Sequence, residues 1–229
     1  MAQMKTPGVY IIEKNAFPNS VVEVATAIPA FIGHTQFARD GNKDLTGIPF
    51  RISSMAEFHS FFGFAPTLRF GIRPEDSESE DTTNDINVLF PDGSCQLTLP
   101  KTFYALYYNM LLFYANGGGP CYIVSIGDYE HDFKSIDFTN ALLALKKEQE
   151  PTLVVVPEAV YMEEGDCYKV QTGALMHCGN DMKNRFAILD VFNGYKDENG
   201  AVIKSFRENI GSNFLAYCAS YYPSINPSI

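Results

Sequence analysis

The chain has 229 residues, 46% of them hydrophobic and 14% aromatic, which is enough apolar surface for one large domain or two small ones. Its formal net charge is −10 without any basic cluster, and this makes binding to nucleic acids or to anionic membranes unfavourable. The longest nearly apolar run, residues 103–115, is shorter than the roughly 20 residues that span a bilayer, and the polar start is unlike a signal peptide.

The first predicted element is an extended arm over residues 1–20. Its apolar run follows Pro7-Gly8 and precedes Pro18, and no turn leads from it to a partner strand. The run is either an edge strand of the chain's own sheet or a strand given to a neighbouring molecule, where backbone hydrogen bonds would supply the affinity. It consists of Val9, Tyr10, Ile11 and Ile12.

Residues 21–100 are predicted to form a β-rich region. Three short apolar runs are candidate strands: residues 21–24, 30–34 and 48–52. A helix is expected to begin at Ser54, because Ser54 and Glu57 have the spacing of a capping box. Gly63 is the expected end of that helix.

An acidic stretch at residues 75–85 holds six acidic residues and no Lys or Arg. It has no apolar periodicity, so we expect a mobile, solvated insertion on the outside of any assembly. Residues 87–90 and 95–99 flank Pro91-Asp92-Gly93, in which proline presets one dihedral angle and glycine accepts a positive one. This pattern predicts a hairpin.

Residues 101–229 have the pattern of an α/β core. A helix is predicted over residues 102–116, and helical patterns separate four apolar runs that begin near Cys121, Thr152, Arg185 and Leu215. The runs are continuously apolar, as strands buried on both faces must be. The predicted fold is therefore α/β, or α+β overall, with a mostly parallel three-layer sheet in residues 101–222 after the β-rich region and the arm.

A parallel α/β sheet invites an enzymatic interpretation, and the glycine run at residues 117–119 is the first candidate. A phosphate loop follows a strand and opens a helix, so that the helix N-terminus faces the anion. Here the glycines follow a predicted helix and precede a predicted strand, so a helix C-cap is expected instead.

The remaining catalytic candidates are isolated in the sequence. His177 and Cys178 are adjacent on a helical stretch and point in different directions, so packing is expected rather than a nucleophile with its base. Asp190 ends a buried strand without a partner, and Tyr221-Tyr222 is expected to be packing surface with wet hydroxyls. The four histidines have no metal-ligand spacing. We expect no catalytic residue, no cofactor and no metal.

The five cysteines, an odd number, predict free thiols and assembly in a reducing compartment such as a cytoplasm. Several blocks of the chain together suggest a family. They are "TPGVYIIEKNAFPNSVVEVATAIPAFIGHT", "SSMAEFHSFFG", "LLFYANGGGPCYIVSIG", "KKEQEPTLVVVPEA", "NRFAILDV", "FRENIGSN" and "AYCASYYP".

In this order the blocks resemble the tail sheath proteins of contractile phage tails and related injection systems. The resemblance implies a structural subunit that stacks in helical rings around an inner tube and contracts to drive the tube into a target cell. It implies as partners neighbouring sheath subunits, the inner tube protein, and baseplate and terminal cap proteins. The particle would be a phage tail or injection particle assembled in a bacterial cytoplasm. The donated strand would be Val9 to Ile12, with an arm hinge at Asn15, Pro18, Asn19 and Ser20.

The chain departs from this family at its end. Sheath proteins usually continue past the "YYP" block into a C-terminal domain, whereas this sequence stops at Ile229, and Ser224 stands where tryptophan is common. Either the sequence is a truncated subunit or that domain is absent. The alternatives are a cap or baseplate-associated structural protein that shares the sheath core and, on fold analogy alone, a small-molecule enzyme.

Overall fold

The computed structural model describes residues 27–68, 70–74, 85–90, 93–98, 102–195 and 200–222. The strand predicted at Val9 to Ile12 and the hinge predicted between Asn15 and Ser20 lie outside these residues. Residues 75–84 of the acidic stretch also lie outside the described residues.

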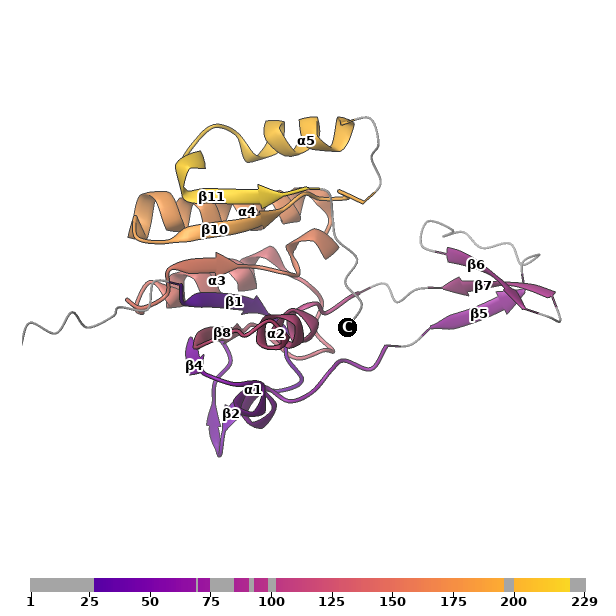
Figure 1. The fold of residues 1–229 in the computed structure, drawn as a ribbon, viewed down its shortest axis with the longest axis horizontal. Coiled ribbons are helices and arrows are strands. Elements are labelled where there is room, and N and C mark those ends of the chain that lie inside the picture. The colour runs from indigo at the N-terminus through magenta and orange to yellow at the C-terminus, as the bar shows by residue number, and fades with distance from the viewer. Residues whose placement is uncertain are drawn as a thin grey trace, which may run out of the picture.

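A six-stranded sheet forms the centre of the molecule (Figure 1). Its order is β11-β10-β9-β1-β8-β4, with the first five strands parallel and β4 antiparallel to β8. The strands are β1 (Pro29–Gly33), β4 (Phe50–Ile52), β8 (Cys121–Ser125), β9 (Leu153–Val155), β10 (Phe186–Asp190) and β11 (Cys218–Tyr221). The expected mostly parallel α/β sheet is confirmed.

The main sheet combines strands from before and after residue 100. β1 pairs with both β8 and β9, and β4 adds to the edge of the same sheet. All five residues of β1 are buried, as a strand between two parallel neighbours requires. The sheet therefore takes two of its six strands from the segment that the sequence pattern assigned to a separate β-rich region.

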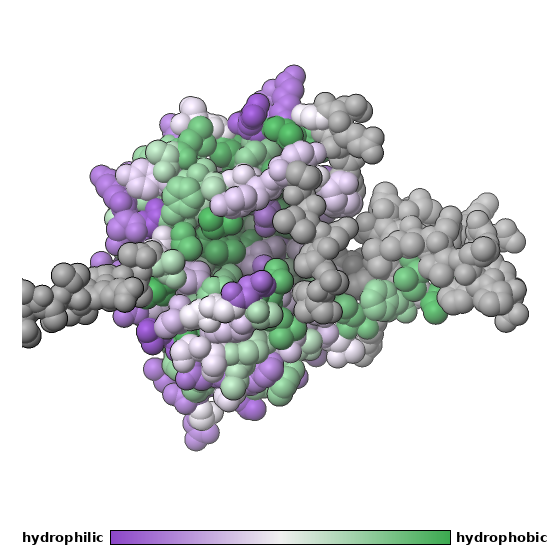
Figure 2. Space-filling model, viewed as in Figure 1, coloured by the Kyte–Doolittle hydropathy of each residue, from purple (hydrophilic) through white to green (hydrophobic). Residues whose placement is uncertain are grey.

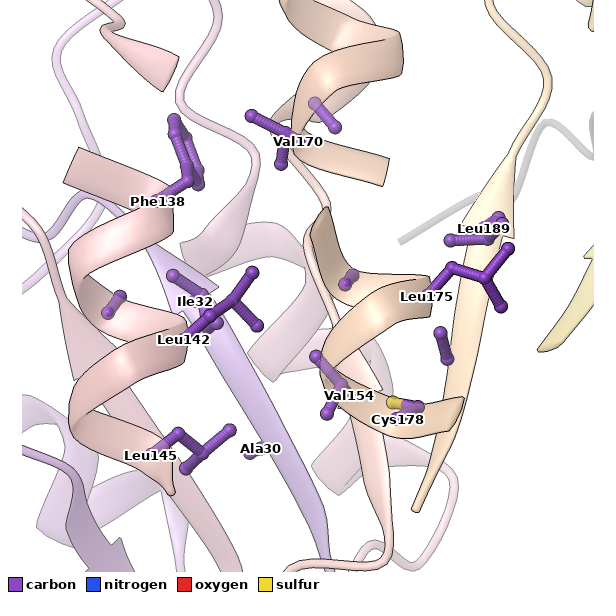
Figure 3. Close-up of a cluster of buried hydrophobic side chains, with 14 of the residues drawn as sticks. Ala30, Ile32, Phe138, Leu142, Leu145, Val154, Val170, Leu175, Cys178 and Leu189 are labelled. Carbon is purple, nitrogen blue, oxygen red and sulfur yellow. The ribbon is translucent and has the colours of Figure 1, made fainter. Parts of the chain in front are cut away.

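Helices pack on both faces of the sheet. α1 (Met55–Phe62) and α2 (Leu106–Ala115) share one face, while α3 (Ser135–Leu145), α4 (Glu164–Met176) and α5 (Ala201–Ile210) share the other. Side chains alternate along β1, so that Phe31 joins the core under α1 and α2 while Ala30 and Ile32 join the core under α3 and α4. Figure 3 shows Ile32 beside Leu142 in this second core.

The described residues also form short helical turns between the longer elements. They are the 3₁₀ turns at Ala159–Tyr161 and Leu215–Tyr217 and the π-helical turn at His177–Met182. None of the helices in the described ranges is both long and apolar enough to cross a membrane.

The start and end of α1 follow the sequence signals. Ser54 is the N-cap and its Oγ accepts a hydrogen bond from the N–H of Glu57, while Gly63 ends the helix at φ 86°. The Glu57 carboxylate accepts from the N–H and the hydroxyl of Ser53 rather than from the N–H of Ser54. The expected capping box is thus shifted by one residue on its acidic side.

Two small antiparallel units lie beyond the main sheet. The predicted hairpin is present, because β6 (Asp85–Phe90) pairs with β7 (Gly93–Thr98), and β5 (Gly71–Pro74) adds to it. This three-stranded sheet extends away from the main sheet in Figure 1. The other unit is a short hairpin of β2 (Arg39–Asp40) and β3 (Lys43–Asp44).

On the face that carries α1 and α2, these two helices cover only part of the main sheet. Along β9 and β10 the buried residues Val154, Ala187 and Leu189 face α3 and α4. The alternate residues Leu153 and Ile188 are only half-buried, and no helix of the described residues covers them. Figure 2 shows hydrophobic side chains gathered on this uncovered half.

Candidate functional site

The order of the strands places one crevice where ligands usually bind in sheets of this kind. From the central strand β1 the chain moves to β8 on one side and later to β9 on the other. In open α/β sheets, ligands bind outside the carboxyl ends of the strands where the winding direction reverses. Here that point lies between the ends of β1 and β9, and His34 and Glu158 follow these two ends.

The carboxylate of Glu158 fills this crevice. It accepts hydrogen bonds from the main-chain N–H of His34 at 3.0 and 3.2 Å, and its Oε2 lies 2.7 Å from His34 Nδ1. The side chains of His34 and Glu158 are 1% and 0% exposed. Each is therefore desolvated, and each finds its partner in the other.

Glu158 also stands at the N-terminus of α2. Its Oε1 accepts from the N–H of Leu106 at 3.3 Å, and the N-cap residue Ala105 provides no side-chain cap of its own. The first N–H groups of a helix attract an anion, which in nucleotide-binding folds is a phosphate. In this protein the anion at that position is a side chain of the protein itself.

Two opposing effects act on the Glu158 carboxyl group. Burial raises its pKa and is the larger effect, while the hydrogen bonds and charge of His34 and the N–H of Leu106 favour the ionised form. The pair is a structural unit rather than a poised acid, because every hydrogen bond of the carboxylate goes to a group of the scaffold.

The space around the pair is closed by the protein. A Cβ added to Gly33 would lie 3.0 Å from both the Glu158 carboxyl and Leu106 Cβ. On the outer side, the rings of Tyr104 and Phe133 lie with their centroids 5.3 and 4.9 Å from the His34 ring. The crevice is thus filled by aromatic side chains and by Glu158.

The glycine run has the predicted order and role. It follows α2 and precedes β8, Gly117 has φ 82°, and the N–H groups of Gly117 and Gly118 bond to the carbonyls of Tyr114 and Phe113 at 3.1 and 2.9 Å. These bonds close the C-terminus of α2. Helix C-terminal carbonyls repel anions, so this is the wrong helix end for a phosphate.

His177 and Cys178 do not form a reactive pair. His177 Nε2 lies 2.9 Å from Arg185 Nη1. Burial, together with the charge of Arg185, lowers the pKa of His177 to about 4. Burial raises the pKa of Cys178 to about 12, so its thiol is protonated. Cys178 packs in the core under α3 and α4, as expected for a buried free thiol.

The other candidates are not brought together either. Asp190 is exposed at the end of β10, where its carbonyl accepts from Gln171 Nε2 at 2.7 Å. Tyr221 and Tyr222 are 69% and 38% exposed, in agreement with wet hydroxyls at a packing surface. Within the described residues, no group of three His, Cys, Asp or Glu side chains could hold a metal ion.

The His34–Glu158 pair is what sequence reasoning missed. Both residues follow buried apolar runs, and the carboxyl ends of parallel strands meet at one edge of the sheet. That signal was available for Glu158 after "TLVVVP", but it needed the position of β1 in the same sheet.

The comparisons with known proteins add no family. The chain matches no protein-family model and shows no significant similarity to a curated protein.

Proposed function

We propose that this chain is a structural subunit of a contractile tail sheath, which polymerises in helical rings around an inner tube. The observation that carries the proposal is the Glu158 carboxylate at the N-terminus of α2. It occupies the place where nucleotide-binding proteins with an open α/β sheet hold their ligand. An α/β scaffold whose ligand crevice is filled in this way suits a protein that acts through its surfaces.

Apolar surface on the described residues supports an interaction role. Phe70 and Ile72 are 50% and 67% exposed where the three-stranded sheet begins, and no helix of the described residues covers β9 and β10 on one face of the main sheet. Clustered exposed apolar residues are typical of contact surfaces between proteins. The sequence blocks that resemble sheath proteins give this surface a partner class, namely further copies of the chain.

The arm supplies the proposed connection between copies. Val9 to Ile12 would pair with a neighbouring subunit, and the segment from Asn15 to Ser20 would bend while subunits rotate during contraction. A paired strand keeps its hydrogen bonds during such a rotation, so subunits stay connected.

The test is electron microscopy of particles that carry the tagged chain, purified from a host that expresses its whole gene neighbourhood. We expect hollow tubes or contracted cylinders, and a Tyr10→Pro variant should abolish them because proline removes an N–H from the strand pairing. Gln3→Pro, outside the strand, is the matched control and should leave the tubes intact.

Circular dichroism of the Tyr10→Pro chain should show an unchanged folded core, because both hydrophobic clusters of the described residues form from Ile28 onward. Normal tubes from Tyr10→Pro would exclude the proposed arm pairing. Absence of any tube in the wild-type preparation would exclude the sheath function, and short capped rings would favour the cap or baseplate alternative.

A further inference from the structure

The main sheet ends on one side at β11, which is its outermost strand in Figure 1. β11 pairs with β10 on one side only. In the described part of the chain, no other hydrogen bond between backbone groups involves residues 219–221. α5 packs on α4, where the ring centroids of Phe206 and Tyr168 lie 6.3 Å apart, so this helix covers a face of the sheet rather than its edge.

The opposite edge of the same sheet is protected by charge. Arg51 lies at the centre of the edge strand β4, and its Nε forms an ion pair with Glu150 at 3.1 Å. Charged side chains on an edge strand are one feature by which sheets avoid pairing with other chains. β11 has no charged side chain, so its edge lacks this protection.

The whole segment around β11 is uncharged and partly apolar on its surface. Residues 211–222 contain no Asp, Glu, Lys, Arg or His, although 19% of the chain is charged. Phe214, Leu215 and Tyr221 are 36%, 48% and 69% exposed. The cores of protein interfaces are depleted in charge and enriched in aromatic residues, so this edge has the composition of a contact surface.

We propose that β11 pairs with β11 of a second copy of the chain, antiparallel about a twofold axis. A twofold interface brings the same surface together twice. An uncharged strand can meet itself without repulsion between like charges, whereas it offers nothing to a partner that is recognised by its charge. This pairing belongs to the free chain, and it does not rest on the sheath proposal.

The side chains favour a register centred on Ser220. Directly opposite residues share a face of the sheet, so each residue must face itself or one an even number of positions away. With Ser220 at the axis, the large side chain of Tyr221 faces the small Ala219 of the second copy. A register centred on Ala219 would instead place Tyr221 opposite Tyr217, which belongs to a 3₁₀ turn and is not extended.

The first test is the oligomeric state of the full chain. Because the pairing covers only about five residues of each copy, the interface is small and the dimer should be weak. In sedimentation velocity we expect the 25.5 kDa monomer at about 5 µM and a mass rising towards twice that value at about 500 µM. A wild type that stays monomeric at the higher concentration would overturn the proposal.

Ser220→Lys is the variant that should abolish the dimer. Two lysines would face each other at the twofold axis, and like charges directly opposite each other destabilise a strand pair. The matched control is Ser212→Lys, which changes an exposed serine of the same segment outside the strand and should dimerise like the wild type. Both variants have the same net charge, so overall repulsion does not distinguish them. Dimerisation of Ser220→Lys as strong as that of Ser212→Lys would contradict the pairing.

Ser220→Cys tests the register. Directly opposite Cα atoms in antiparallel strands lie about 4.5–5.5 Å apart, within the range that a disulfide spans. Oxidised glutathione should therefore link two copies of this variant at position 220, as peptide mapping by mass spectrometry would show. Ala219→Cys is the control, because its two copies would be diagonal neighbours, roughly 7–8 Å apart and too far for a disulfide. A link at position 219, or none at position 220, would overturn the pairing.

Tyr10→Pro separates this dimer from the arm pairing of the sheath proposal. The full-length Tyr10→Pro chain should dimerise like the wild type, because residues outside the arm form the contact. Loss of the dimer in Tyr10→Pro would mean that the arm of another copy occupies this edge, and it would overturn the pairing of β11 with β11.

Discussion

His34 Nδ1 lies 2.7 Å from Glu158 Oε2, although the two residues are 124 positions apart in the sequence. The contact joins the ends of β1 and β9, the two strands between which the winding of the sheet reverses. Through Leu106 N–H the same carboxylate also holds the first turn of α2. One buried side chain thus connects three elements that the local sequence forms independently.

Replacement of Glu158 should distinguish lost charge from lost hydrogen bonds. In Glu158→Gln the amide oxygen can accept from the N–H groups of His34 and Leu106, while the amide N–H donates to His34 Nδ1 in its other tautomer. Glu158→Ala leaves these donors buried and unpaired. We expect a cost of about 3–5 kcal/mol for Ala and less than about 2 kcal/mol for Gln in urea unfolding. Equal losses for both variants would contradict this account.

His177 should make the protein sensitive to mild acid. Burial and the Arg185 charge lower the pKa of His177 to about 4 from an ordinary value of 6.5, so the folded protein binds this proton less readily than the unfolded chain. Stability from this group is therefore present above pH 6.5 and is lost as the pH falls towards 4, by about 3 kcal/mol.

The comparison variant is His177→Gln, whose side-chain oxygen can still accept from Arg185 Nη1. Its free energy of unfolding should fall less steeply than that of the wild type over the same pH window. Parallel pH profiles of the two proteins would show that His177 does not carry the effect.

Local sequence signals predict most of the helices and strands, but they do not predict which strands pair with one another. Ser54 and Gly63 bound α1 because capping is a local interaction, and the apolar runs at Cys121 and Arg185 read as buried strands for the same reason. Pairing of β1 between β8 and β9 is long-range, and a short apolar run does not specify its partners. The His34–Glu158 contact depends on that pairing, so it could not be predicted before the topology.

The N-cap of α1 gives a simple local prediction. Ser54→Ala removes the acceptor for Glu57 N–H and should cost about 1 kcal/mol. In a double-mutant cycle, Ser54→Ala and Glu57→Gln should be nearly additive, because the Glu57 carboxylate bonds to Ser53 and not to Ser54. A large coupling energy would mean that Ser54 and Glu57 interact with each other as in the full capping box predicted from the sequence.

Gly33→Ala tests how tightly the crevice is filled. The new methyl group would lie 3.0 Å from the Glu158 carboxyl and from Leu106 Cβ. Neither neighbour moves freely, because Glu158 is held by His34 and Leu106 N–H, and Leu106 is fixed in the first turn of α2. We expect a loss of about 1–3 kcal/mol from overpacking.

Gly165→Ala is the matched control for this substitution. Gly165 lies in the first turn of α4, and a Cβ there would meet nothing within 4 Å. Alanine in a helix is favoured over glycine by roughly 0.5–1 kcal/mol, so this variant should raise the free energy of unfolding. Thermal unfolding of both variants measures the contrast. A Gly33→Ala protein as stable as the wild type would mean that the crevice has room to spare, and a small ligand could then compete with Glu158 for the N-terminus of α2.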